Sequence, residues 1–440
     1  MNGIRWASAN PVIGLDEKLP RSVAVNTFWL LAGRVAAQAL GVLFTVLIAR
    51  RLGEAGLGQY AFISAAILLG NVFTTVGLDT YLIREVARER RAAPPVLAAA
   101  LWIQLGFSAL FILAINLGAP FLTNKTPETL LALRLYSLAL IPLAFTTVFS
   151  AVLRAYQRMD LYVLAALVTA IAQALAAFAV LAQGGGLLPL AWGLLGAQGL
   201  GALAAGGLCV ACLSGFAFGW RTAGETIQVI LRRSWPLALL AALGVVYQRL
   251  EVLLLSMLAP DAVTGWFSAA ARIGEAVKLG HYAFLGAMFP VLSGLNFQPR
   301  GTLGEKTTGT QQVQALPESA PFYRGSINLL YLFSFGAAVV LTALAGPLIK
   351  LLYGAPYAPS AAALRILAWS LLPYAYSAQA SLKLVTGGRE QPVVQALSIA
   401  LAATCLVSFL LIPAWGLLGA CWAALVGETI HALVLWMLTR

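Results

Sequence analysis

Charged side chains lie inside long apolar segments of this sequence, where charges are energetically costly. Six of them are basic: Arg34, Arg134, Arg249, Arg272, Lys278 and Arg365. Three are acidic: Glu251, Glu275 and Glu428. A charge that faces lipid at the middle of a bilayer costs at least ~2.5–3.5 kcal/mol, so we expect most of these side chains to face a polar interior. The excess of basic residues predicts a cavity that attracts an anion, and arginine forks suit phosphate in particular.

Arg34 has the clearest sequence context of these residues. Polar or small residues recur around it at i, i+7, i+11, i+14 and i+18, namely Thr27, Arg34, Gln38, Gly41 and Thr45. This spacing places them on one face of a helix. The same apolar segment contains no acidic residue that could neutralise Arg34. We therefore predict that Arg34 binds substrate.

Other polar residues extend the predicted cavity over four apolar segments. The full set of predicted substrate-binding residues is Arg34, Gln38, Asn71, Tyr247, Arg249, Arg272, Glu275, Lys278 and Tyr282. Glu251 and Glu428 are candidates for ion or proton coupling, and Glu428 either pairs with a cation or carries a proton. Structural ion pairs of Arg249 with Glu251 and of Arg272 with Glu275 remain an alternative. The sequence predicts no catalytic residue, no metal site and no cofactor.

The composition predicts that these residues are positioned by membrane-spanning helices. Hydrophobic residues make up 60% of the 440 residues and charged residues only 10%, whereas soluble domains carry about 25% charged residues. Apolar runs of roughly 20 residues recur, and each can cross a bilayer as a helix. We predict an all-α membrane protein with twelve spans, at 23–49, 57–78, 95–118, 129–152, 161–182, 188–213, 234–258, 263–292, 324–346, 361–384, 392–412 and 416–438.

Lysine and arginine residues predict the orientation of these spans. With both termini in the cytoplasm, 18 basic residues fall in cytoplasmic segments and 4 in outer loops, which fits the excess of positive charge expected on the cytoplasmic side. We therefore expect a multi-pass protein of the cytoplasmic membrane. The net charge of +12 is explained by this bias and does not indicate nucleic acid as a partner.

An internal repeat divides the chain. The heptapeptide Ala-Trp-Gly-Leu-Leu-Gly-Ala occurs at 191–197 and again at 414–420. A Leu-Arg pair stands eight residues before Pro142, and the same arrangement precedes Pro373. These matches predict two parallel six-helix lobes, 1–220 and 221–440, around a central cavity. We expect a flexible cytoplasmic loop at about 295–322, which is rich in Gly, Thr, Gln and Pro.

Several motifs resemble those of a known family. Near the N-terminus these are residues 26–34 (NTFWLLAGR), 49–61 (ARRLGEAGLGQYA) and 76–88 (VGLDTYLIREVAR). Near the C-terminus they are 387–390 (GGRE) and 411–420 (LIPAWGLLGA). Read in this order, they resemble the polysaccharide biosynthesis and export flippases of the multidrug/oligosaccharidyl-lipid/polysaccharide exporter superfamily. The resemblance covers essentially the whole chain.

The resemblance implies a transporter and not an enzyme. Such flippases translocate polyprenyl-pyrophosphate-linked oligosaccharides, precursors of cell-surface polysaccharide, by alternating access. The implied partners are this lipid-linked substrate, the bilayer, and a polysaccharide polymerase or glycosyltransferases. Two alternatives remain: a multidrug/cation antiporter of the same superfamily, and a membrane-embedded glycan polymerase or ligase. Arg34 disfavours the antiporter, whose first span usually carries an acidic residue, and the short outer loops disfavour the enzyme.

Overall fold

Helices make up the regular structure of this chain. The computed structural model describes residues 18–88, 93–212, 223–296 and 321–439, and these residues contain no strand. The N-terminal elements are α1 (Lys18–Thr75), α2 (Leu78–Arg88), α3 (Ala93–Gly118), η2 (Ala119–Phe121), α4 (Pro127–Ser137), α5 (Leu140–Ala155), α6 (Met159–Ala182) and α7 (Leu187–Cys212). The C-terminal elements are α8 (Ala223–Leu258), α9 (Asp261–Asn296), α10 (Pro321–Leu352), η4 (Ala355–Tyr357), α11 (Pro359–Trp369), α12 (Leu371–Thr386) and α13 (Gln391–Thr439).

The predicted all-α membrane class is confirmed. Eight stretches of the described helices are long and apolar enough to cross a membrane. Many large apolar side chains are exposed on the outer helices, among them Leu110 and Leu113 on α3 and Leu332 on α10. Such residues belong in lipid, because hydrocarbon is the solvent that they prefer. The protein is therefore a multi-pass membrane protein.

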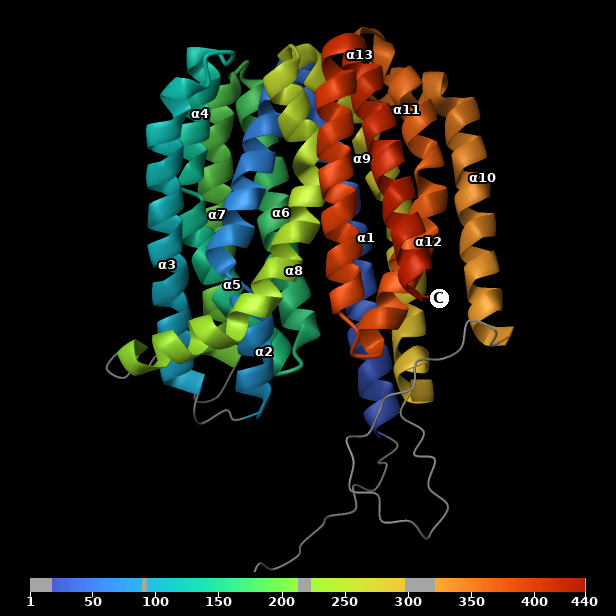
Figure 1. Cartoon of the computed structure of the whole chain (residues 1–440). Coiled ribbons are helices and arrows are strands. Elements are labelled where there is room, and N and C mark those ends of the chain that lie inside the picture. Colours follow the sequence, from blue (N-terminus) through green and yellow to red (C-terminus); the bar gives the residue numbers. More distant parts are fainter. Residues whose placement is uncertain (1–17, 89–92, 213–222, 297–320, 440) are drawn as a thin grey trace, which may run out of the picture.

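Two elements each combine two predicted spans. The spanning part of α1 has 48 residues and that of α13 has 49, and a straight helix of this length would be about 72 Å long, more than twice the thickness of the hydrocarbon core. Each is interrupted by one glycine with a positive φ, Gly53 in α1 (φ 72°) and Gly416 in α13 (φ 52°). In Figure 1 both elements run up the molecule, turn at its upper end and return.

The two spans that contain the predicted Arg–Pro pairs are broken in the same way. The predicted span 129–152 consists of α4 and α5, and 361–384 consists of α11 and α12. Pro142 is the third residue of α5 and Pro373 is the third residue of α12. Proline lacks a backbone N–H and disfavours helix for the residue before it. This correspondence supports the predicted repeat, although the division into two lobes stays a prediction.

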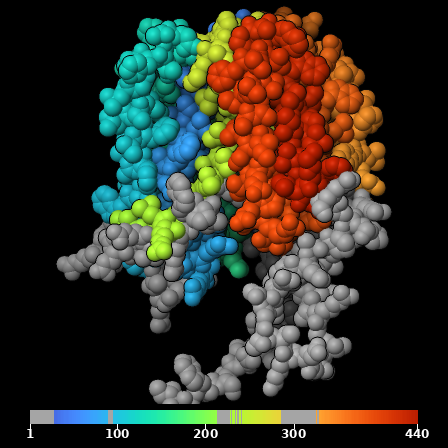
Figure 2. All heavy atoms as spheres, viewed as in Figure 1, coloured from blue at the N-terminus to red at the C-terminus, as the bar shows by residue number. Residues whose placement is uncertain are grey.

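Other boundaries differ from the predicted ones. Helix α8 begins at Ala223, eleven residues before the predicted start at 234, and α2 is a separate amphipathic helix that follows the second span. The predicted flexible loop at 295–322 lies almost wholly outside the described residues. In Figure 2 the N-terminal helices (blue to green) and the C-terminal helices (orange to red) lie side by side, with parts of α8 and α9 between them.

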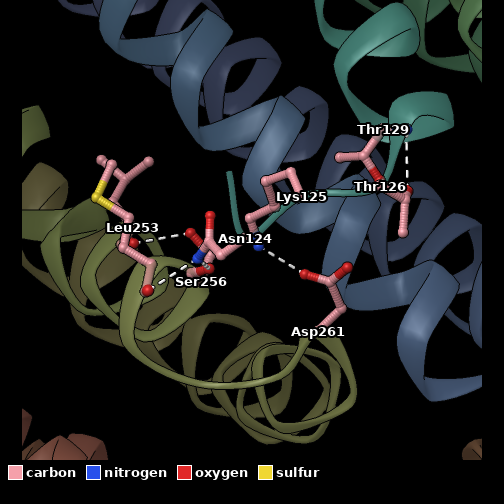
Figure 3. Close-up of polar contacts among 8 residues, drawn as sticks. Asn124, Lys125, Thr126, Thr129, Leu253, Ser256 and Asp261 are labelled. Carbon is pink, nitrogen blue, oxygen red and sulfur yellow. Dashed lines mark hydrogen bonds and ion pairs between the residues drawn. The ribbon is translucent and has the colours of Figure 1, made fainter. Parts of the chain in front are cut away.

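One end of the molecule, where α1 turns at Gly53, is held together by polar contacts between distant segments. Lys125 Nζ lies 2.6 Å from Asp261 Oδ1, and the lysine side chain is only 1% exposed. The neighbouring Asn124 donates to the carbonyl oxygens of Met257 at 2.8 Å and Ser256 at 3.3 Å, at the end of α8 (Figure 3). These contacts join the segment before α4 to the turn between α8 and α9. We call this region the closed end.

Backbone contacts reinforce the closed end. A Cβ atom on Gly58 of α1 would lie 1.8 Å from the carbonyl oxygen of Asp261, and one on Gly265 of α9 would lie 1.9 Å from that of Glu54. The two helices therefore touch along their backbones, which only glycine allows. Arg50 adds a hydrogen bond of 2.7 Å from Nε to the carbonyl oxygen of Leu352, at the end of α10.

Candidate functional site

A cavity of about 1190 Å³ lies between the N-terminal and C-terminal helices. Its walls come chiefly from α1, α8, α9, α12 and α13. Along α1 the wall begins at Leu30 and continues past the turn to Leu68. The cavity exceeds the range of about 300–1,000 Å³ typical of sites for small molecules. It is large enough for a ligand bigger than a drug-sized molecule.

Most of the predicted site residues line this cavity. They are Arg34, Gln38, Tyr247, Arg249, Glu251, Arg272, Glu275, Lys278, Tyr282 and Glu428. Asn71 is not among them. The wall ends at Leu68, and Asn71 lies beyond it among polar residues that bond to one another: its carbonyl oxygen accepts from Thr75 Oγ1 at 2.6 Å, and Gln104 Nε2 donates to Thr75 Oγ1 at 3.3 Å.

The cavity is less basic than the sequence predicted. Arg134 and Arg365 do not line it, which leaves Arg34, Arg249, Arg272 and Lys278 against three glutamates. Arg134 lies in the last turn of α4, and Arg365 is exposed on α11. Each side chain is on the short first helix of a span that is broken into two helices, and neither lines the central cavity. The cavity therefore has an excess of one positive charge, not three.

The predicted polar face of the first span does point into the cavity. Arg34, Gln38 and Thr45 line the wall. Gly41, on the same face, contacts Arg272 so closely that a Cβ atom would lie 2.0 Å from its Nη2. The glycine thus provides the space that the guanidinium group of Arg272 occupies. The 3.6-residue periodicity was sufficient to find this face because α1 is regular between Leu30 and Thr45.

Glu275 joins two arginines from different helices. Arg249 Nη1 of α8 donates to Glu275 Oε1 at 3.2 Å, and Arg272 Nη1 of α9 donates to Glu275 Oε2 at 3.1 Å. The three side chains are 26–34% exposed, so they remain accessible from the cavity. The predicted alternative of an Arg272–Glu275 ion pair is therefore correct as geometry. The alternative pair of Arg249 with Glu251 is not formed, and Arg249 pairs with Glu275 instead.

A second ion pair links α9 to α13. Lys278 Nζ lies 3.3 Å from Glu428 Oε1 and also 4.3 Å from the ring centroid of Tyr374. Tyr374 packs edge-to-face on Tyr282, whose ring lies 5.9 Å from the Arg34 guanidinium carbon. Rings of this kind attract cations through their electron-rich faces. Two tyrosines thus connect the cations of α1 and α9.

Arg34 and Glu251 differ from the other charged residues of the cavity. Neither forms an ion pair with any residue that the structure describes, and the Arg34 side chain is exposed. Glu251 interacts electrostatically with Glu428, Lys278 and Arg249. Arg34 is thus the cavity cation that is most available to an anionic ligand.

Polar atoms without partners are numerous in the wall. Among the described residues, these buried atoms are Gln38 Nε2, Arg249 Nε, Ser268 Oγ, Arg272 Nε, Glu428 Oε2 and His431 Nε2. Buried polar groups in native proteins are nearly always hydrogen-bonded. In the wall of a cavity, such atoms can bond to water or to a polar ligand.

Sequence reasoning missed the contribution of α12 and its neighbours. Ser370, Tyr374, Ser377 and Ser381 all line the cavity. Their spacing of i, i+4, i+7 and i+11 is a helical face of the same kind as that around Arg34. The signal was therefore present in the sequence. It is weak because serine is tolerated on any face of a membrane helix.

Solved structures with the same fold are transporters. One is an inward-facing multidrug resistance MATE family transporter of the MOP superfamily (15% identity, TM-score 0.73, covering 92% of this chain and 94% of that one). Another is the lipid II flippase MurJ in an inward closed conformation (15% identity, TM-score 0.73, 95% and 87% coverage). A third is a MOP superfamily transporter from Pyrococcus furiosus, described as having a binding pocket of reverse polarity (13% identity, TM-score 0.69, 96% and 95% coverage). The fold of this chain is that of the MOP superfamily.

A comparison of the sequence with models of protein families identifies the family within this fold. Residues 23–296 match the model of the family described as polysaccharide biosynthesis protein. The match covers more than half of the chain, so the chain belongs to the polysaccharide biosynthesis protein family. This confirms the family that its motifs resemble. No curated protein sequence matches the chain significantly.

Proposed function

We propose that the protein is a flippase that moves a polyprenyl-pyrophosphate-linked oligosaccharide across the cytoplasmic membrane by alternating access. The observation that carries this proposal is Arg34, which forms no ion pair with any residue that the structure describes, in a cavity of about 1190 Å³. An available guanidinium group suits a pyrophosphate, which accepts several hydrogen bonds from it. Tyrosine rings and hydroxyl groups along the same wall suit sugars. Membership of the polysaccharide biosynthesis protein family supports this substrate class.

The cavity and the closed end fit one state of such a cycle. The wall extends toward the predicted cytoplasmic ends of the spans, to Leu30, Tyr282 and Val385. The closed end lies at the predicted outer side, where Lys125 binds Asp261. In this state the head group enters from the cytoplasm while the lipid tail stays in the bilayer. Both termini are cytoplasmic in this scheme, and polymerase or glycosyltransferase partners act before and after translocation.

Glu251 and Glu428 are the proposed coupling residues. Glu428 pairs with Lys278, whereas Glu251 lies nearby without an ion pair to a described residue. Uptake of a proton or cation by these carboxylates would make the wall more positive and raise its affinity for an anion, and loss of that proton or cation would lower the affinity again. This provides a physical route from an ion gradient to substrate release.

The experiment is deletion of the gene in its own host, complemented by the wild type or by Arg34→Ala. We expect the deletion to accumulate one polyprenyl-pyrophosphate oligosaccharide on the cytoplasmic leaflet. Wild-type protein should clear it and Arg34→Ala should not, at equal abundance in the membrane. An unchanged lipid pool together with altered sensitivity to cationic drugs would assign the protein to the antiporters and contradict the proposal.

A further inference from the structure

The carboxylate of Glu275 lies between two guanidinium groups. Each of its oxygens accepts one hydrogen bond, from Arg249 at 3.2 Å and from Arg272 at 3.1 Å. The group is about one-third exposed and lines the cavity. An ion pair this exposed is easy to open, because water weakens the attraction between the charges.

The two arginines come from different helices, α8 and α9, and Arg272 also lies against Gly41 of α1. Each guanidinium group has five N–H donors, and its described contact to Glu275 uses one of them. The pair is therefore a fork that can bind an anion with more acceptor oxygens than one carboxylate has.

We propose that Glu275 determines specificity by competing with the cargo for Arg249 and Arg272. Its carboxylate occupies the position that the anionic group of the cargo takes, and the cargo must displace it. This inference rests on the proposed function and adds a selection rule to it. The rule is that the cargo must carry more negative charge than the single charge of a carboxylate.

The selection rule addresses a problem that every lipid-transporting cavity faces. Ordinary phospholipids surround the protein in large excess, and a phosphodiester head group carries one negative charge. A carboxylate also carries one, so such a head group gains nothing by displacing Glu275 and loses its own hydration. A diphosphate diester carries two negative charges and offers more acceptor oxygens, so it gains from the exchange. Glu275 would thus act as a built-in competitor that disfavours phospholipid head groups, and proteins commonly achieve specificity by disfavouring the wrong ligand in this way.

The experiment measures binding by the purified full-length protein in nanodiscs of uncharged lipid at fixed ionic strength. The probes are geranyl pyrophosphate, which has a diphosphate on a short isoprenoid, and dihexanoyl phosphatidylglycerol, which has one phosphodiester. We expect wild type to bind only the diphosphate. In Glu275→Gln we expect diphosphate affinity to rise about tenfold, since an arginine hydrogen bond to a charged group is worth roughly that factor. We also expect phosphatidylglycerol to bind this variant.

Glu251→Gln is the matched control. It removes the same charge from the wall of the same cavity but frees no arginine, because Glu251 forms no ion pair with a described residue. We expect it to raise the diphosphate affinity less than threefold, roughly the effect of one distant charge in a wet cavity. Equal gains in the two glutamine variants would reduce the effect to net charge and overturn the inference.

Other outcomes are equally decisive. Unchanged or weaker diphosphate affinity in a folded Glu275→Gln protein would make the residue a structural brace and overturn the inference, while wild-type binding would leave the proposed function standing. Failure of wild type and every variant to bind diphosphate would remove the proposed function itself. If Glu275→Gln does not fold, Glu275→Asp replaces it. Its shorter carboxylate cannot span both arginines, so we expect a gain of a few fold in diphosphate affinity, and no gain would overturn the inference.

Discussion

Arg34 has the same character in the sequence and in the structure: it is a basic residue without an acidic partner among the described residues. It has no acidic neighbour in its span, and it has no ion pair within the part of the chain that the structure describes. Its partner is the ring of Tyr282 at 5.9 Å. A charged residue in a membrane interior is costly, and such residues commonly mark a substrate or ion pathway.

We therefore predict that Arg34→Ala abolishes export while leaving expression and membrane insertion intact. Arg34→Lys should retain partial activity, because it keeps the charge but loses the bidentate fork. The measurement is clearance of the lipid-linked oligosaccharide in the complemented deletion host, with protein abundance determined in the same membranes. Full activity of Arg34→Ala would remove the residue from the mechanism.

Gly41 determines where Arg272 can lie. A Cβ atom there would come within 2.0 Å of Arg272 Nη2, so Gly41→Ala should push the guanidinium group away from its position beside Glu275. We predict at least about a tenfold loss of diphosphate affinity, equivalent to one strong charge-assisted hydrogen bond. Gly244→Ala is the control, since Gly244 lines the same cavity with nothing within 4 Å of an added Cβ atom. Similar affinities for the two variants would show that Arg272 does not need this space.

The first helix depends on a single glycine for its turn. Gly53 has φ 72° and ψ −173°, a conformation that is essentially restricted to glycine. Nothing lies within 4 Å of an added Cβ atom, so an alanine there would suffer from backbone strain and not from a steric clash. This turn brings Arg34 and Ser64, on opposite limbs of α1, to the same cavity.

We predict that Gly53→Ala destabilises the protein by about 1–3 kcal/mol, measured as a lower midpoint of thermal unfolding in detergent. Gly106→Ala is the comparison, because Gly106 lies in regular helix α3 and also has nothing within 4 Å. Alanine is favoured over glycine inside a helix by roughly 0.8–1.0 kcal/mol, so this variant should be unchanged or slightly more stable. Equal midpoints for the two variants would contradict the importance of the turn.

At the scale of the whole molecule, the closed end joins segments that are far apart in the sequence. The Lys125–Asp261 pair joins residues 136 positions apart, and Lys125 is 1% exposed. Removing one partner of a buried pair leaves the other charge unpaired, at a cost of about 3–5 kcal/mol to the state that contains it. If the helices move apart during transport, this cost falls on the closed state alone.

We predict that Lys125→Met opens the closed end. The measurement is the rate at which a membrane-impermeant thiol reagent, added on that side, labels Ser64→Cys in a protein without its native cysteines. We expect a rise of about tenfold or more. Lys350→Met is the control, because Lys350 is an exposed lysine in the last turn of α10. The exchange Lys125→Asp with Asp261→Lys should restore slow labelling, and a wild-type rate in Lys125→Met would show that the pair does not close this end.

The sequence by itself determined the membrane class, the approximate positions of the apolar spans and the polar face of the first span. These follow from local properties, because the length of an apolar run and the 3.6-residue period depend only on neighbouring residues. It also located ten of the eleven predicted cavity and coupling residues on the cavity wall, since buried charge inside lipid has few alternatives. Asn71 is the exception. Uncharged polar residues such as serine, threonine and asparagine can also hydrogen-bond to one another between helices, away from a cavity.

Only the tertiary structure decided how the charges pair. Glu275 could have bound Arg272 alone or left Arg249 to Glu251, and the sequence does not distinguish these arrangements. The outcome depends on how α8 and α9 pack, on the space above Gly41 and on the turn at Gly53, which are contacts between residues far apart in the chain. An ion pair needs its charged atoms within about 4 Å of each other, so pairing is fixed by the packing of the helices and not by the order of residues along them.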